Sequence, residues 1–154
     1  MGVVINRPIE LNVASLFKQM QLEIEFSPLL EKPLHFGGPV QQERGFILHT
    51  PHAEYNSTLL VNNSIALTTS KDILEAAAHH DAPEKMLIAL GYAGWTTGQL
   101  EDEMKRNAWL NLETQLVSDL HALIFDAPNQ DKFNLAMNMM GLNLANLSDV
   151  AGHA

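Results

Sequence analysis

The sequence predicts an α+β fold built on a mixed sheet, because strand patterns cluster in the middle of the chain and helical patterns interrupt them irregularly. A doubly wound fold would instead alternate strands and helices regularly. The chain has 154 residues, of which 46% are apolar, and this suffices for a domain with its own core. We therefore expect residues 1–154 to form a single domain.

The first third of the chain contains short strand patterns and one clear helix. Gly2–Ile5 is apolar throughout and predicts a buried strand that ends before Pro8. Asn12 precedes an apolar stripe with the spacing i, i+3, i+4, i+7, which predicts a capped helix. The stripe consists of Val13, Leu16, Phe17 and Met20. Further strands are expected at 34–36, 45–50, 57–61 and 65–69, the last two flanking a hairpin turn at 62–64.

The second half alternates helix and strand patterns. We expect Ser70 to cap a short helix containing Ile73, Leu74 and Ala77. Met86–Leu90 is the strongest interior strand, and Thr97 should cap a helix over 98–107, whose acidic start and basic end suit the helix dipole. Residues 118–125 alternate like a half-buried strand. A last helix over 129–140 should place Phe133, Ala136, Met137 and Met140 on one face and end at Gly141.

Composition excludes several chemistries. The chain has no cysteine, so disulfide scaffolds, thiolate metal sites and cysteine nucleophiles are excluded. The net charge is −9 and the nine basic residues are scattered, which argues against direct nucleic-acid binding. There is no P-loop, dinucleotide-binding, serine-hydrolase or zinc-protease motif, so we expect no metal and no cofactor. The sequence shows no secretory leader or membrane-spanning segment, and we expect a cytoplasmic protein without membrane attachment.

Two glycine-containing segments are the candidate binding residues. The first contributes Gly37, Gly38, Pro39, Arg44, Gly45 and His49. It is either a strand–turn–strand connection or a concave loop whose amides and Arg44 hold a carboxylate or phosphate. The second contributes Gly91, Tyr92, Trp95, Glu101, Asn107 and Trp109, including both tryptophans of the chain. It is either a ligand site at a strand–loop–helix junction, or a region where Trp95 and Trp109 fix the helix to the sheet.

These segments resemble the YqgE/AlgH family of bacterial proteins. The resemblance rests on GGPV…RGFILH, LTTSKDILE and LGYAGWTTGQLEDEMKRNAWL, with MGVVINRPIE at the start and VAGHA at the end. It implies an α+β fold with a mixed, partly barrel-like sheet surrounded by helices, in a cytosolic protein without a known cofactor. The family is largely uncharacterised, although the name AlgH suggests a transcriptional regulator. Its pattern normally has a further segment before the position that matches Met1, so we expect N-terminal strands to be missing.

Three functions remain open at this point. The leading hypothesis is a regulatory or accessory protein that binds a partner protein or a small anionic ligand through the two segments. In it, Arg44 supplies charge, the glycines supply main-chain access, and Trp95 and Trp109 supply apolar walls. The alternatives are a direct transcriptional regulator and a small hydrolase that pairs His49 with a carboxylate such as Glu101.

Overall fold

The computed structural model describes residues 1–24, 26–112 and 117–142. The chain divides into two compact units, Met1–Gly94 and Trp95–Ala154. The prediction of a single domain over the whole chain stays a prediction.

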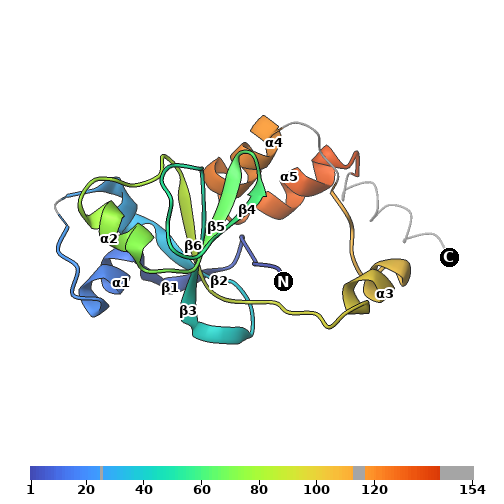
Figure 1. Cartoon of the computed structure of the whole chain (residues 1–154). Coiled ribbons are helices and arrows are strands. Elements are labelled where there is room, and N and C mark those ends of the chain that lie inside the picture. Colours follow the sequence, from blue (N-terminus) through green and yellow to red (C-terminus); the bar gives the residue numbers. More distant parts are fainter. Residues whose placement is uncertain (25, 113–116, 143–154) are drawn as a thin grey trace. The chain divides into compact units, whose positions relative to one another are not determined.

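The first unit contains an open, six-stranded mixed sheet with the strand order β1-β2-β6-β3-β5-β4 (Figure 1). β2 and β6 are parallel, and the other neighbouring strands are antiparallel. The strands are β1 (Pro8–Asn12), β2 (Pro33–Phe36), β3 (Val40–His49), β4 (Thr58–Asn62), β5 (Ile65–Thr68) and β6 (Met86–Tyr92). The α+β class is therefore confirmed, but the expected barrel-like character is not, since the sheet does not close.

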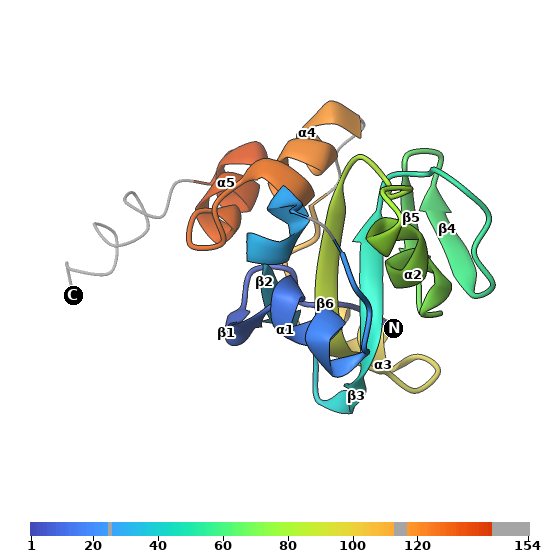
Figure 2. The ribbon, with the colours of Figure 1, turned by 90° about the vertical axis from the view of Figure 1, so that its left-hand side faces the viewer.

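Helices α1 (Val13–Gln19) and α2 (Asp72–Ala78) pack on the sheet, and the 3-10 turn η1 (Pro28–Glu31) lies between α1 and β2 in the chain (Figure 2). The buried core contains side chains from both helices and from the central strands. It includes Val13, Phe17, Leu34, Ile47, Ile73, Leu74, Ala77, Met86 and Ile88. The predicted cap of α1 is confirmed, because the Asn12 side chain accepts a hydrogen bond from the Ser15 amide at 2.9 Å.

Two predictions in the first unit were wrong, and one expected strand is longer than predicted. Gly2–Ile5 is not one of the named strands, and Gly2 forms only an isolated bridge with Ala93. Ser70 does not cap α2, since its hydroxyl bonds to the Asp72 carboxylate and Lys71 occupies the N-cap position. The strand expected from 45 is present as the second half of β3, which begins earlier because Val40 also pairs with Tyr92 of β6; the register shifts before Gly45 pairs with Leu90.

The second unit is helical where the structure describes it. It contains α3 (Gln99–Lys105), α4 (Val117–His121), the π-helical turn η2 (Ala122–Asp126) and α5 (Lys132–Met139). In η2 the Ala127 amide donates to the Ala122 carbonyl at 2.8 Å, and the buried Lys132 ammonium donates to the Ile124 carbonyl at 2.7 Å.

The strand expected at 118–125 is therefore wrong. Leu120, Leu123 and Ile124 also have the i, i+3, i+4 spacing of a helix, and a short apolar window does not separate the two periods. Thr97 is not the cap of α3 either, because Gly98 is at that position. On α5, Met137 is buried as expected, whereas Phe133 is exposed.

Candidate functional site

The first glycine segment meets the start of the second one inside the first unit. A Cβ on Gly37 would lie 2.2 Å from the Gly91 carbonyl oxygen, and one on Gly38 would lie 2.1 Å from the carbonyl carbon of Tyr92. The Gly37 amide donates to the Leu90 carbonyl at 2.8 Å. All three glycines are buried. We call Gly37, Gly38 and Gly91 the glycine crossing, since two main-chain segments pass here too closely for a side chain.

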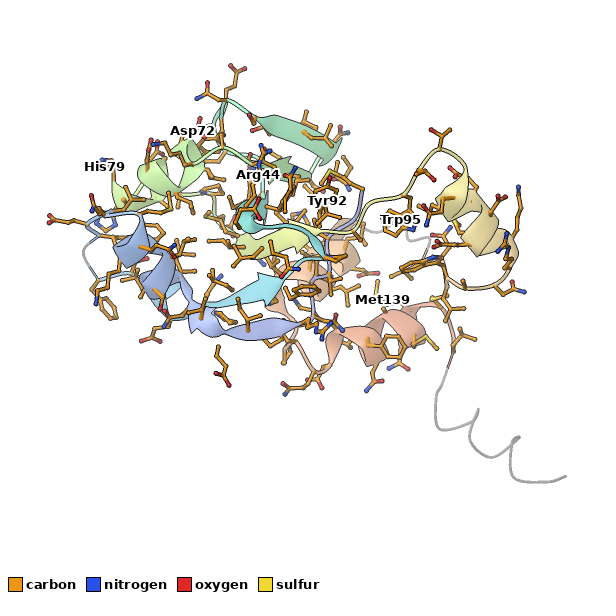
Figure 3. All side chains as sticks on the ribbon, turned by 90° about the horizontal axis from the view of Figure 1, so that it is seen from below. Arg44, Asp72, His79, Tyr92, Trp95 and Met139 are labelled. Atoms are coloured by element: carbon orange, nitrogen blue, oxygen red, sulfur yellow. The ribbon has the colours of Figure 1, made fainter. Side chains whose placement is uncertain are left out.

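Arg44 lies beside the glycine crossing on β3, with aromatic neighbours. Its guanidinium donates to the Thr69 hydroxyl at 3.0 Å and lies 6.0 Å from the centre of the Phe46 ring. The Phe46 ring is itself 5.1 Å from that of Tyr92, and Arg44 and Tyr92 are both labelled in Figure 3. Within the described residues, no carboxylate pairs with Arg44. Arg44 is also exposed, and a guanidinium has the fork of N–H donors that matches carboxylates and phosphates.

Pro39 and Gly45 are two further candidates of the first glycine segment. Pro39 is exposed directly after the glycine crossing and its carbonyl accepts from the Gln42 side chain at 3.3 Å. Gly45 lies in β3 opposite Leu90, and a Cβ there would meet only the end of the Ile47 side chain, at 3.9 Å.

His49 is buried in a polar network at the end of β3, with only 1% of its surface exposed. Its Nδ1 lies 2.8 Å from the Thr50 carbonyl, which can only accept, so Nδ1 carries the proton and Nε2 accepts from the Thr68 hydroxyl at 2.8 Å. Burial lowers the pKa of His49, which favours this neutral form. Both ring nitrogens are thus occupied within the first unit, and Glu101 of the hydrolase hypothesis belongs to the second unit.

The two tryptophans of the second unit share one carboxylate. Glu103 Oε2 accepts a hydrogen bond from Trp95 Nε1 at 3.0 Å and from Trp109 Nε1 at 2.7 Å. Its other oxygen, Oε1, accepts from the Gln99 side chain at 2.9 Å. The two indole rings meet edge to face, with centroids 5.7 Å apart. We call Trp95, Glu103 and Trp109 the indole clamp; Trp95 is labelled in Figure 3.

The end of α3 explains how Trp109 reaches this carboxylate. Asn107 has the left-handed φ of 57°, its amide donates to the Met104 carbonyl, and the Ala108 amide donates to the Glu103 carbonyl. These two bonds form a Schellman motif, which reverses the chain direction directly after the helix. Asn107, a candidate binding residue of the second segment, thus ends α3. Glu101 lies exposed in the first turn of α3, where its charge suits the helix dipole.

Hydrogen bonds keep the clamp carboxylate charged. Donation from Trp109, Gln99 and Trp95 lowers the pKa of Glu103. Trp109 nevertheless remains 49% exposed, and the neighbouring Leu110 is 60% exposed. A cavity of about 420 Å³ adjoins the clamp. Its lining is Thr96, Thr97, Gly98, Gln99, Asp102, Glu103 and Arg106.

The sequence candidates therefore divide between the two units. The first unit contains Gly37, Gly38, Pro39, Arg44, Gly45, His49, Gly91 and Tyr92, and the second contains Trp95, Glu101, Asn107 and Trp109. Sequence reasoning assigned Glu103 only to the helix dipole and missed that it joins the two indoles. The sequence does place Glu103 four residues after Gln99 and six before Trp109, and this spacing was the one signal that it could contact both.

Neither a metal cluster nor a membrane-spanning helix occurs in the described part of the chain. No group of three or more His, Asp or Glu residues there could hold a metal ion. No helix among the same residues combines the length and apolar character that crossing a membrane requires.

Comparisons with known proteins give one consistent match. The AlgH-like family model matches residues 1–145. A UPF0301 protein of Thiobacillus denitrificans is 49% identical over 154 residues, which cover 100% of this chain and 80% of that relative. A UPF0301 protein of Azoarcus sp. is 46% identical, with 100% and 79% covered. The solution structure of AlgH from Pseudomonas aeruginosa matches with a TM-score of 0.75 and 42% identity, over 100% of this chain and 79% of that one.

Proposed function

We propose that this chain, which belongs to the AlgH-like family, acts as a regulatory or accessory protein by binding a partner protein through the indole clamp. The observation that carries the proposal is a half-exposed tryptophan held in one position. Trp109 is fixed by its bond to Glu103 and by the edge of Trp95, yet 49% of it faces solvent.

Such a side chain suits a binding anchor for two reasons. Tryptophan is among the residues that contribute most to binding energy at protein interfaces. A side chain that is already ordered in the free protein loses little conformational entropy when it binds. Leu110, the next residue in the chain, and Met104 on α3 are further exposed apolar side chains of the same unit.

The charge of the clamp favours a partner with basic and apolar side chains. Glu103 is held ionised, and Glu101 and Asp102 precede it on α3. The whole chain carries −9, so a basic segment of a partner is attracted and an acidic one is repelled. The indole faces add a surface on which lysine and arginine side chains bind favourably.

The test is a quantitative pull-down from a bacterial lysate with the tagged chain and two matched variants. Trp109→Ala removes the anchor, while Phe133→Ala removes an aromatic side chain of similar exposure, 54%, from the same unit. We expect Trp109→Ala to reduce recovery of the captured protein by about 10-fold or more, as removal of a central interface tryptophan does. Phe133→Ala should leave recovery unchanged. Equal recovery with all three proteins at equal stability would contradict the proposal.

Arg44 supports a second candidate, the binding of a small anion in the first unit. Its guanidinium is exposed without a carboxylate partner among the described residues, and it lies beside aromatic rings. Calorimetric titration with inorganic phosphate tests this candidate, using Arg44→Gln against Arg7→Gln as the control. Heat of binding that is lost only in Arg44→Gln would support it, and identical heats in both variants would exclude it.

A further inference from the structure

A cavity of about 320 Å³ lies in the first unit between two segments that are far apart in the sequence. One wall comes from η1 and the residue that follows it, and includes Leu29 and Lys32. The other wall comes from the last turn of α2 and the connection to β6, and includes Ala77, His80 and Glu84. The volume is at the lower end of the range for small-molecule sites, so the cavity suits a ligand with few atoms.

The floor of the cavity is apolar and belongs to the core of the unit. Ala77 and Met86 are buried members of the core cluster, and Leu29 packs against that cluster. Pro83, which also lines the cavity, is buried too. An apolar group of a ligand that reaches this floor leaves water, and this favours binding.

The rim of the cavity is charged on both sides. Lys32 and Glu84 lie on opposite walls and are exposed. In the described part of the chain, neither the Lys32 ammonium nor the Glu84 carboxylate forms an ion pair or a hydrogen bond, so the two do not pair with each other. A ligand between the walls therefore meets one positive and one negative group that no described residue neutralises.

The end of α2 places a third polar side chain, His80, on the rim. The His80 amide donates to the Ala77 carbonyl at 3.2 Å, and the Asp81 amide donates to the Ala76 carbonyl at 3.0 Å. These bonds form a Schellman motif in which His80 has a left-handed φ of 60°. The chain turns here, directly after His79, which is labelled in Figure 3. An imidazole has at least one N–H donor in either charge state.

The two rim charges distinguish between classes of ligand. A simple anion is attracted by Lys32 but repelled by Glu84, and a simple cation is attracted by Glu84 but repelled by Lys32. A zwitterion can place each of its charged groups next to an opposite charge, and it can bridge two groups that do not reach each other. An α-amino acid has its carboxylate, its ammonium and its side chain on one carbon, so all three can contact one small cavity.

We propose that this cavity binds a free α-amino acid with an apolar side chain, such as leucine. Its carboxylate lies at Lys32 and accepts from His80, its ammonium donates to Glu84, and its side chain covers Ala77 and Met86. We expect a dissociation constant on the order of 1 mM, because a ligand with so few atoms makes few contacts. This inference goes beyond the proposed function, since it uses only the first unit and not the indole clamp.

The test is an NMR titration of the isotope-labelled chain with leucine and two analogues. Leucinamide lacks the carboxylate, and N-acetylleucine lacks the ammonium. We expect leucine to cause saturable shifts of the amide signals of Ala77, Glu84 and Met86. Each analogue should bind at least about fivefold more weakly, because it loses one charge-assisted hydrogen bond.

Four variants assign the two contacts. Lys32→Gln and Glu84→Gln should each weaken leucine binding about fivefold or more. Lys18→Gln and Glu43→Gln remove exposed charges of the same unit that do not line the cavity, and they should leave the affinity unchanged. Lys32→Gln should also bind leucine and leucinamide equally, because the partner of the carboxylate is gone.

All four positions are exposed, and the spectrum itself shows that each variant is folded. The absence of saturable shifts at the cavity with about 20 mM leucine would overturn the proposal, since this is well above the expected dissociation constant. Equal affinities for leucine and both analogues would also overturn it, and so would an equal loss of affinity in Lys18→Gln and Lys32→Gln.

Discussion

The glycine crossing in the first unit consists of buried main chain, whereas the indole clamp in the second unit consists of side chains that reach solvent. At the crossing, a Cβ on Gly37 would lie 2.2 Å from the Gly91 oxygen, so any side chain there would force main-chain atoms to move. At the clamp, Trp109 is held by Glu103 and stays half-exposed. The crossing therefore contributes packing within the fold, whereas the clamp is the exposed surface on which the proposed function depends.

The largest expected effect is the loss of stability when a side chain is added at the crossing. Gly91→Ala combines a positive φ of 75° with a Cβ 2.3 Å from the Gly38 oxygen. We expect it to lower the free energy of unfolding by about 3 kcal/mol or more, because main-chain atoms must move. Urea unfolding followed by circular dichroism measures this, with Gly45→Ala as the control. A loss below about 1 kcal/mol would mean that the crossing is not tightly packed.

The second unit also contains a buried basic residue, Lys132. Its burial disfavours the charged form, whereas hydrogen bonds favour the charged form of Glu103. Burial lowers the pKa of Lys132 from 10.5 to about 8. Between these two values the unfolded chain binds more protons, so the free energy of unfolding should rise with pH by up to about 1.4 kcal/mol per unit.

Unfolding of the natural chain at pH 8, 9 and 10, compared with Lys132→Met, isolates the effect of Lys132. The methionine variant should lack this part of the slope. Parallel pH profiles of the two proteins would show that Lys132 keeps its ordinary pKa in the fold.

A glycine near the clamp should tolerate substitution far better than Gly91. Gly98 also has a positive φ, 81°, but a Cβ there would meet nothing within 4 Å. We expect Gly98→Ala to cost only about 1 kcal/mol, which is the local cost of the left-handed conformation. If Gly98→Ala were as destabilising as Gly91→Ala in the same urea experiment, the contrast between the two regions would fail.

The smallest effect on stability is expected for the clamp carboxylate. Glu103→Gln keeps the size of the side chain but removes the charge that accepts both indole bonds. The two indoles are the only tryptophans, so the emission spectrum of the folded protein reports directly on the clamp. We expect a clear change in emission with little change in unfolding.

Acid titration gives a matching result in the natural chain. Because hydrogen bonds lower the pKa of Glu103 below 4.5, the emission should change only below that ordinary value as the pH falls. A transition centred at or above pH 4.5 would show that the carboxylate is not held by the indoles.

Local patterns predicted much of the first unit. The stripe after Asn12, the hairpin at 62–64 and the apolar run at Met86–Leu90 each carry enough information within a few residues. Gly2–Ile5 failed because strand formation depends on a partner, which an apolar run does not specify. Residues 118–125 failed because their apolar positions fit both the strand and the helix period.

The candidate residues were found by type, but their roles were not predictable. The sequence gives no distance between Gly37 and Gly91, so the glycines could not be assigned to mutual packing rather than to ligand access. The link from Glu103 to both tryptophans depends on the Schellman motif after α3, which reverses the chain between the helix and Trp109. Such a contact arises from main-chain geometry at one residue, Asn107.

The central claim is that the indole clamp binds a partner, and the most direct test uses its own fluorescence. The protein captured by the natural chain is purified as a tryptophan-free variant and titrated into the natural chain. We predict a saturable blue shift of the emission, because the exposed half of Trp109 leaves water on binding, and no such shift in the tryptophan emission of Trp109→Phe. Saturable binding without any change in emission would contradict the account.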